Sequence, residues 1–246
     1  MFETIKCIEL QKNQVIKDIK NATVNEKFRG LSKIHSEKCT NCNECKNICP
    51  TNAIIGIGED LSIDLGKCIF CGECERVCTS DVIKFSNFHK LGSTLREGLI
   101  TKGELDPIKS TEFIKKTFGR SFKLRQVSAG GCNSCEMELG ACSNANFDMG
   151  RFGIEFVASP RHADGIVITG PITKNMAKAL EDTYQAISEP KIIILVGACA
   201  ISGGIFQNSE ELNREFLEKH KVDLYISGCP AHPLTIINAI LDFLGR

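Results

Sequence analysis

The chain is 246 residues long, carries no net charge and is 42% hydrophobic. This composition supports a packed core, and it argues against a nucleic-acid-binding protein, because such proteins usually carry a basic excess. No stretch approaches the ~20 apolar residues that cross a bilayer, and the N-terminus lacks the apolar core of a signal peptide. We therefore expect a cytoplasmic protein that reaches a membrane only through partner subunits.

Cysteine is unusually frequent, with 14 residues in the chain. Such a content indicates either a framework of disulfides or the binding of metal. A chain with enough apolar residues for a core and no export signal has no need of disulfides. The spacing of the cysteines also favours metal.

The first 35 residues are polar and rich in lysine, and we expect them to form an arm or a docking segment. Residues 36–86 form the next predicted domain and contain eight cysteines in two runs. Each run has the spacing C-x2-C-x2-C-x3-C, and the second run begins 29 residues after the first. The runs are Cys39, Cys42, Cys45 and Cys49, and then Cys68, Cys71, Cys74 and Cys78. This repeat indicates a pseudo-symmetric module with two metal sites.

The spacing is typical of a ferredoxin-like module with two [4Fe–4S] clusters. Three cysteines separated by two residues wrap a tight loop around three corners of a cubane. The fourth begins a short helix and binds the other cluster. The spacing thus predicts a crossed arrangement, in which Cys78 completes the first cluster and Cys49 completes the second. Zinc is disfavoured, since it takes two separated cysteine pairs at one tetrahedral site.

Residues 87–121 contain no cysteine, and we interpret them as a linker with one or two helices. In residues 122–246, short apolar runs alternate with amphipathic stretches, which indicates a parallel sheet with helices on both faces. The predicted strands are 123–128, 154–158, 165–169, 191–196 and 222–227, and the predicted helices are 135–147, 173–187, 209–219 and 233–244. We therefore expect an α/β protein, with a flavodoxin-like parallel-sheet domain after the ferredoxin-like module.

Four further cysteines come directly after predicted strands. Because the carboxyl ends of parallel strands share one edge of the sheet, these residues are expected to meet where such sheets bind ligands. They are Cys132, Cys135, Cys199 and Cys229. Neighbouring glycines, which let the backbone approach a ligand closely, include Gly131, Gly197 and Gly228. The spacing alone allows one zinc ion or one [4Fe–4S] cluster, and the eight cysteines upstream favour the cluster.

Two parts of the sequence resemble known families. The segments FRG, EKCTNCNECKNICPTNAI and LGKCIFCGECERVC, within residues 28–86, are similar to the two-cluster ferredoxin subunit of formate hydrogenlyase and of complex I. The segments GGCNSCEME, SPRHAD, ITGPIT, GACAISGG and GCPAHP, within residues 122–246, resemble the small subunit of membrane-bound, energy-converting [NiFe] hydrogenases. The B-type subunit of complex I is a more distant relative. In this chain the two subunits are fused.

The resemblance implies that Cys132, Cys135, Cys199 and Cys229 bind a proximal [4Fe–4S] cluster, which brings the expected total to three clusters. It also implies a separate large subunit with nickel and iron, membrane subunits, and an electron donor such as formate dehydrogenase, carbon monoxide dehydrogenase or ferredoxin. Complex I-type chains have adjacent cysteines where this chain has Cys132-x2-Cys135, and this difference favours the hydrogenase side.

Some other residues have two possible roles. Glu138 matches a family glutamate near the proximal cluster, although a carboxylate also suits the first turn of a helix. Arg161 and His162 lie in the SPRHAD loop, where a cation would tune the potential of a reduced cluster; a solvated loop is the alternative.

Three other residues are expected to have no role in binding metal. Cys7 and Cys142 stand alone and are expected to be small buried apolar residues. His89 is expected to lie on the surface.

We expect an electron-transfer subunit of a formate hydrogenlyase-like [NiFe] hydrogenase, which passes electrons through two ferredoxin-type clusters to the proximal one. No catalytic residue is expected in the chain itself, because twelve of its cysteines are assigned to clusters. The alternatives are a complex I-like NADH/quinone oxidoreductase module and a stand-alone redox carrier or sensor.

Overall fold

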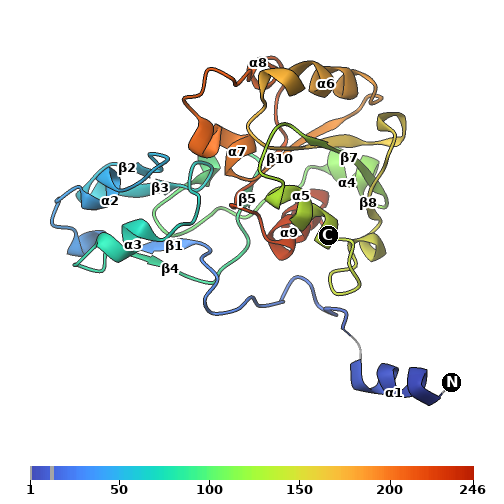
Figure 1. Cartoon of the computed structure of the whole chain (residues 1–246), viewed down its shortest axis with the longest axis horizontal. Coiled ribbons are helices and arrows are strands. Elements are labelled where there is room, and N and C mark those ends of the chain that lie inside the picture. The colour runs from blue at the N-terminus through green and yellow to red at the C-terminus, as the bar shows by residue number, and fades with distance from the viewer. Residues whose placement is uncertain (1, 12–13) are drawn as a thin grey trace.

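The computed structural model describes residues 2–11 and 14–246. A smaller, cysteine-rich part lies beside a larger α/β part, and helix α1 (Phe2–Gln11) projects away from both (Figure 1).

The larger part is built on a six-stranded sheet in the order β5-β11-β10-β9-β7-β8. The strands after residue 121 are parallel. If these five strands are numbered in chain order, their order across the sheet is 2-1-3-4-5, which is that of flavodoxin-like folds. The predicted fold class is thereby confirmed. The strands are β5 (Gly92–Ser93), β7 (Phe122–Ser128), β8 (Ile154–Phe156), β9 (Gly165–Thr169), β10 (Ile192–Val196) and β11 (Leu224–Ile226).

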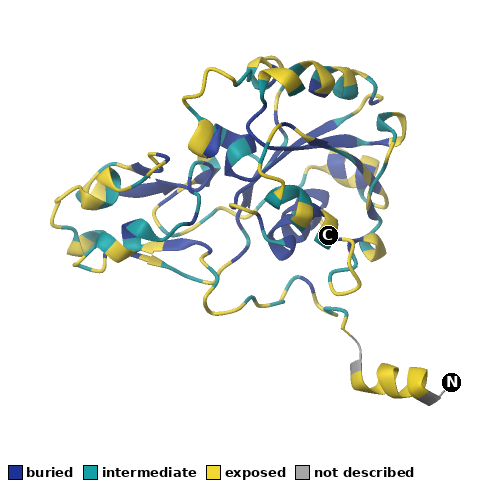
Figure 2. Cartoon of the chain, viewed as in Figure 1, coloured by how far each residue is buried: buried dark blue, intermediate teal, exposed yellow. Residues whose placement is uncertain are grey.

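Helices cover both faces of this sheet (Figure 1). The helices are α4 (Glu112–Phe118), α5 (Ser134–Ala141) and α9 (Pro233–Leu244) on one face, and α6 (Lys174–Gln185) and α8 (Glu215–Lys219) on the other. Every residue of β9 and β10 is buried (Figure 2), as expected of central parallel strands covered on both faces. Successive side chains of β10 alternate between the faces, so Ile193 packs towards α6 and α8 while Ile194 packs towards α9.

The cysteine-rich part holds two small antiparallel sheets. One pairs β1 (Ser32–Ile34) with β4 (Ile83–Phe85), and the other has the order β2-β3-β6. The remaining elements are β2 (Ile54–Ile55), β3 (Ser62–Asp64), β6 (Ile100–Thr101), α2 (Glu44–Asn47) and α3 (Glu73–Val77).

The short helices α2 and α3 come before the fourth cysteine of each run, so the prediction that this cysteine begins a helix is wrong. In the first run the helix ends before Cys49, because Pro50 disfavours the helical conformation of the residue that precedes it. In the second run Cys78 is already extended, with φ −79° and ψ 100°.

The segment 87–121 contributes one strand to the six-stranded sheet and one to the three-stranded sheet. Strand β5 pairs with β11 of the larger sheet, and β6 pairs with β3 of the smaller one. The two sheets also share one hydrophobic core, which contains Leu65 and Ile168. The boundaries at residues 36, 87 and 122 therefore stay a prediction.

Two predicted helices differ from the observed ones. Helix α8 begins only at Glu215, because Ser209 Oγ accepts a hydrogen bond from Glu211 N and folds the preceding residues into a turn. Helix α5 ends at Ala141, and turns follow it up to Phe147. The structure adds α7 (Ala198–Ser202), which the sequence did not predict.

Of the residues expected to be structural, Cys142 is fully buried, as predicted. Cys7 is exposed, so its prediction is wrong, because α1 does not pack on the body of the molecule (Figures 1 and 2). The surface prediction for His89 is also wrong: its side chain is buried. Burial, together with the nearby His232 and Lys90, lowers the pKa of His89 to about 4.

Candidate metal centres

Two cavities in the cysteine-rich part are each lined by four thiols. Both combine three cysteines of one run with the fourth cysteine of the other run, in the crossed pattern that the spacing predicts. The first is lined by Cys39, Cys42, Cys45 and Cys78, and the second by Cys49, Cys68, Cys71 and Cys74.

The backbone around the two cavities repeats along with the cysteines. Asn41, Asn43 and Asn52 have φ values of 60°, 65° and 51°. Phe70, Gly72 and Asp81, at the corresponding places in the second run, have φ values of 53°, 82° and 53°. The first two of each set tighten the loop that carries the first three thiols, and Asn52 and Asp81 form the turn after the fourth. Asparagine and glycine accept this conformation readily, whereas Phe70 is a strained residue of the kind that clusters at functional sites.

Backbone N–H groups point at the cysteine sulfurs. Ala53 N donates to Cys49 Sγ at 3.2 Å, and Val82 N donates to Cys78 Sγ at 3.4 Å in the equivalent place of the second run. Phe70 N donates to Cys68 Sγ at 3.3 Å. Hydrogen bonds to cluster sulfurs stabilise negative charge and set the reduction potential.

A third group of thiols lies at the carboxyl edge of the larger sheet. Cys132 and Cys135 follow β7, Cys199 lies in α7 after β10, and Cys229 follows β11. Burial, together with the neighbouring thiols of Cys229 and Cys132, raises the pKa of Cys199 to about 11. Burial likewise raises the pKa of Cys135 to about 12, with contributions from Cys229 and Cys199. The edge of the sheet thus brings together cysteines that are nearly 100 residues apart in sequence.

Glycines leave space for these thiols. A Cβ atom on Gly197 would lie 2.5 Å from Cys135 Sγ, and one on Gly204 would lie 2.9 Å from Cys199 Sγ. Both glycines have positive φ values, 90° and 56°. Side chains at either position would push a thiol out of place. Gly131 and Gly228 also lie in these turns, and a Cβ on Gly228 would meet the backbone of Ala231 at 2.4 Å.

The two thiol sets of the cysteine-rich part fit an iron–sulfur cluster. In each set four thiols stand around a cavity. That is the arrangement that a cubane with one thiolate at each iron requires.

A cavity of about 350 Å³ separates the second thiol set from the sheet edge. Phe70 and Arg29 line it from the cysteine-rich part, and Cys229, Glu138 and His232 line it from the α/β part. Burial raises the pKa of Glu138 and lowers the pKa of His232. Glu138 and Cys229 thus line the same cavity, and a role for Glu138 beside a cluster stays a prediction.

Arg161 and His162 lie elsewhere. They form part of a short 3₁₀ helix (Pro160–His162) between β8 and β9, and both are exposed. Asp164, which follows, accepts a hydrogen bond from Lys123 N at the start of β7, the end opposite the cysteines. Neither Arg161 nor His162 is among the residues that line the cavity beside Cys229, and their tuning role stays a prediction.

The sequence reasoning missed two residues beside the third thiol group. The Glu136 carboxylate accepts hydrogen bonds from Ser128 Oγ and Thr169 Oγ1, both at 2.6 Å, and so joins the ends of β7 and β9 to the helix of Cys135. Its place directly after Cys135 was the available signal. Arg214, whose guanidinium binds the α7 turn, has no such signal, because it lies 15 residues after Cys199.

Comparison with known proteins identifies the two parts. Residues 132–243 match the family model described as NADH ubiquinone oxidoreductase, 20 Kd subunit, and residues 31–79 match the 4Fe-4S dicluster domain. A probable membrane-bound hydrogenase subunit of Pyrococcus furiosus is 36% identical over 126 residues, which cover 51% of this chain and 75% of that protein.

The chain belongs to the family of the NADH ubiquinone oxidoreductase 20 kDa subunit.

Relatives within this family come from different complexes. The B-type subunit of NADH-quinone oxidoreductase from Geotalea daltonii is 40% identical over 119 residues, covering 47% of this chain and 69% of that protein. Formate hydrogenlyase subunit 7 of Escherichia coli is 40% identical over 130 residues, covering 53% of this chain and 51% of that protein.

The predicted resemblance is thereby confirmed, and with it the class of function. This member of the 20 kDa subunit family is an iron–sulfur electron-transfer subunit of an oxidoreductase of the hydrogenase and complex I-like type, and it binds [4Fe–4S] clusters. Among the helices that the structure describes, none has the length and apolar character needed to cross a membrane.

Proposed function

We propose that the chain holds three [4Fe–4S] clusters and passes electrons along them through the molecule. The first cluster would be held by Cys39, Cys42, Cys45 and Cys78, the second by Cys49, Cys68, Cys71 and Cys74, and the third by Cys132, Cys135, Cys199 and Cys229. When bound, each cluster supplies one-electron transfer, and the chain's own residues hold it and set its potential.

The observation that carries this proposal is that the second thiol set is close to each of the other two. Cys45 of the first set is near enough to Cys74 of the second to raise its pKa, although burial is the larger cause. Cys71 of the second set acts in the same way on the pKa of Cys229 of the third, after burial and Cys132. A cluster held by the second set would therefore have the other two sets as its neighbours.

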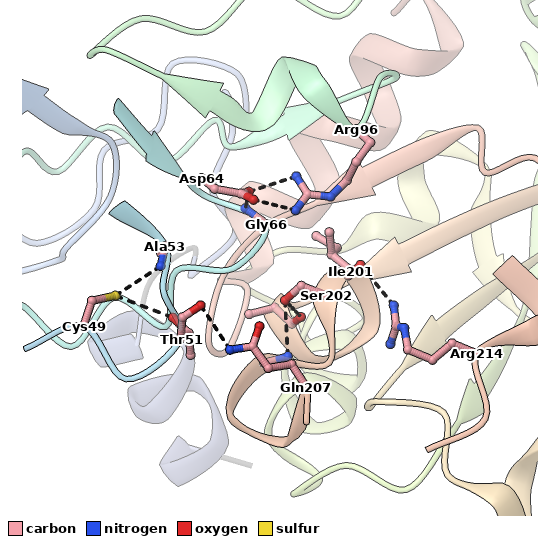
Figure 3. A network of polar contacts seen from close by, with 12 residues as sticks. Cys49, Thr51, Ala53, Asp64, Gly66, Arg96, Ile201, Ser202, Gln207 and Arg214 are labelled. Carbon is pink, nitrogen blue, oxygen red and sulfur yellow. Dashed lines mark hydrogen bonds and ion pairs between the residues drawn. The ribbon is translucent and has the colours of Figure 1, made fainter. Parts of the chain in front are cut away.

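Direct contacts support the junction between the second and third clusters. Gln207 Nε2 donates to Thr51 O at 3.3 Å (Figure 3), and Thr51 Oγ1 lies 3.8 Å from Cys49 Sγ. Gln207 itself follows the Cys199 turn. This contact links the segment after Cys199 to the segment after Cys49.

The third cluster faces a partner that carries the catalytic metal. Cys132 and Cys229 are exposed at the sheet edge, and the exposed apolar side chains Met137, Ile205 and Phe206 flank the same turns. These exposed apolar side chains are available to contact a partner. The partner is a [NiFe] hydrogenase-like large subunit, and the complex lies on the cytoplasmic membrane through its membrane subunits. Formate dehydrogenase, carbon monoxide dehydrogenase or ferredoxin would supply electrons at the first cluster.

The reaction is proton reduction by this complex. The experiment compares hydrogen output from a low-potential donor in the wild-type complex and in Cys229→Ser. We expect the variant to lose most of its hydrogen output while the first two clusters remain reducible. Unchanged output in the variant would contradict the relay through the third cluster.

A complex I-like module is the second candidate, because a relative of comparable identity belongs to an NADH-quinone oxidoreductase. Quinone reduction in place of hydrogen output by the wild-type complex would establish this alternative.

A further inference from the structure

We propose that Arg214 positions the Cys199 turn and that its positive charge raises the reduction potential of the third cluster. The inference rests on the proposed role of Cys199 as a cluster ligand.

The guanidinium of Arg214 binds four backbone carbonyls. Nη1 donates to Pro171 O at 3.0 Å and to Cys199 O at 3.2 Å. Nη2 donates to Ala200 O at 2.7 Å. It also donates to Ile201 O at 3.0 Å (Figure 3). Three of these carbonyls belong to α7, the helix that carries Cys199. A planar guanidinium with its fixed fork of N–H groups can make such a set of bonds, and an ammonium cannot reproduce it.

Helix α7 needs this support. It spans only Ala198–Ser202 and ends at Gly203 in the left-handed conformation. A helix this short is not stable alone, since nucleation is unfavourable and its last carbonyls have no partner within the helix. Arg214 reaches these carbonyls from the segment before α8 and so fixes the turn from outside.

There is little room for the Cys199 side chain to move. Its Sγ lies 2.9 Å from the place that a Cβ on Gly204 would occupy. The thiol therefore fills the space beside this glycine, and a shift of the turn would change its direction. A clamp on the carbonyls of Cys199, Ala200 and Ile201 prevents that shift.

The charge of Arg214 has no carboxylate partner among the ion pairs of residues 2–11 and 14–246. Arg96, which lies nearby, differs in this respect, because it binds both oxygens of Asp64 at 2.8 and 2.7 Å (Figure 3). Arg214 is also half-buried, so water screens it only in part. A cluster gains one negative charge on reduction, and a fixed cation beside a ligand stabilises the reduced form more than the oxidised form.

The experiment uses the full chain with its clusters and measures the midpoint potential of each cluster by redox titration followed with paramagnetic resonance. Arg214→Gln removes the charge. We expect about a tenfold shift of the third cluster's reduction equilibrium towards the oxidised form, or about 59 mV for one electron. The first two clusters serve as internal references, and their potentials should not change.

Two further variants separate charge from position. Arg214→Lys keeps the charge but loses the fork, so we expect a potential near that of the wild type and faster loss of the third cluster to a chelator. Arg125→Gln is the matched control, since Arg125 is also half-buried and donates to a carbonyl, that of Val157, away from the cysteines. It should change neither property.

The outcomes distinguish the inference from the proposal on which it rests. If Cys199→Ser leaves the third cluster's signal unaltered, the ligand assignment fails. If Cys199→Ser alters that signal but Arg214→Gln leaves the potential unchanged, the inference about Arg214 alone is overturned. If Arg214→Gln does not retain its clusters, Arg214→Lys decides, and a lysine variant that holds the third cluster as firmly as the wild type contradicts the positioning role.

Discussion

At the scale of single residues, the cysteine sites depend on space as much as on sulfur. Gly197 lies where any side chain would collide with Cys135 Sγ, and its φ of 90° is unfavourable for other residues. Gly140, inside α5, is different, because a Cβ added there would have no atom within 4 Å. The two glycines therefore have different reasons to be present, and substitution separates them.

We predict that Gly197→Ala abolishes or alters the third cluster and leaves the other two intact. The added Cβ would lie 2.5 Å from Cys135 Sγ, and the left-handed conformation adds strain of about 1–3 kcal/mol. Iron analysis should fall from about 12 to about 8 atoms per chain. Gly140→Ala is the control and should retain all the iron. A Gly197→Ala protein with full iron and an unchanged third signal would refute this account.

The second prediction at this scale concerns crossed ligation. Cys49 lines the cavity of Cys68, Cys71 and Cys74, although it belongs to the first run. Cys49→Ser should therefore alter the signal of the second cluster and spare the first. Cys78→Ser is the matched variant and should do the reverse. Paramagnetic resonance of both proteins measures this, and loss of the first cluster's signal in Cys49→Ser would contradict the crossed arrangement.

At the scale of secondary-structure elements, residues 87–121 hold the molecule together. Strand β5 extends the larger sheet, β6 extends the smaller one, and Ser227 Oγ donates to Leu91 O at 2.8 Å just before β5. Arg96 adds the bidentate ion pair to Asp64. These contacts make the segment a structural part of both sheets.

We predict that cutting the chain within residues 104–109 does not separate its two halves. A protease site introduced there, after β6, leaves β5 and β6 attached to the first half and in contact with their partner strands. The halves should co-elute on gel filtration and separate only in denaturant. A site introduced directly after α1 is the control, since cleavage there should release a free peptide. Separation of the halves in native buffer would show that the segment is a simple tether.

The elements that sequence could predict are those with strong local patterns. The apolar runs of β9 and β10 gave strands correct to within one residue, and the repeated cysteine spacing gave the two thiol sets of the ferredoxin-like part. Strand β5 is only Gly92–Ser93, which has no intrinsic preference for a strand, and it forms because β11 offers an edge. The role of Arg214 also depends on tertiary contacts and leaves no mark in the local sequence.

At the scale of the whole molecule, the three thiol groups predict a definite metal content. Anaerobically purified protein should contain about 12 iron and about 12 sulfide per chain, from three cubanes. The third group is the one for which sequence spacing also allowed zinc. One equivalent of zinc with only about 8 iron would show that the sheet edge holds a single ion. Metal analysis together with acid-labile sulfide determination decides between these outcomes.

An early segment and a late segment of the chain meet in the folded protein, which bears on how the protein is made. Asn238 Nδ2 in α9 donates to Ile19 O at 3.1 Å, across 219 residues of sequence, and the Ile19 side chain is buried in the core that contains α9. Helix α9 leaves the ribosome long after the segment around Ile19, so the contact between Ile19 and Asn238 forms only after α9 has been synthesised. The chain thus completes this contact only after Cys229, the last thiol of the third group, has been synthesised, because α9 follows Cys229 in sequence.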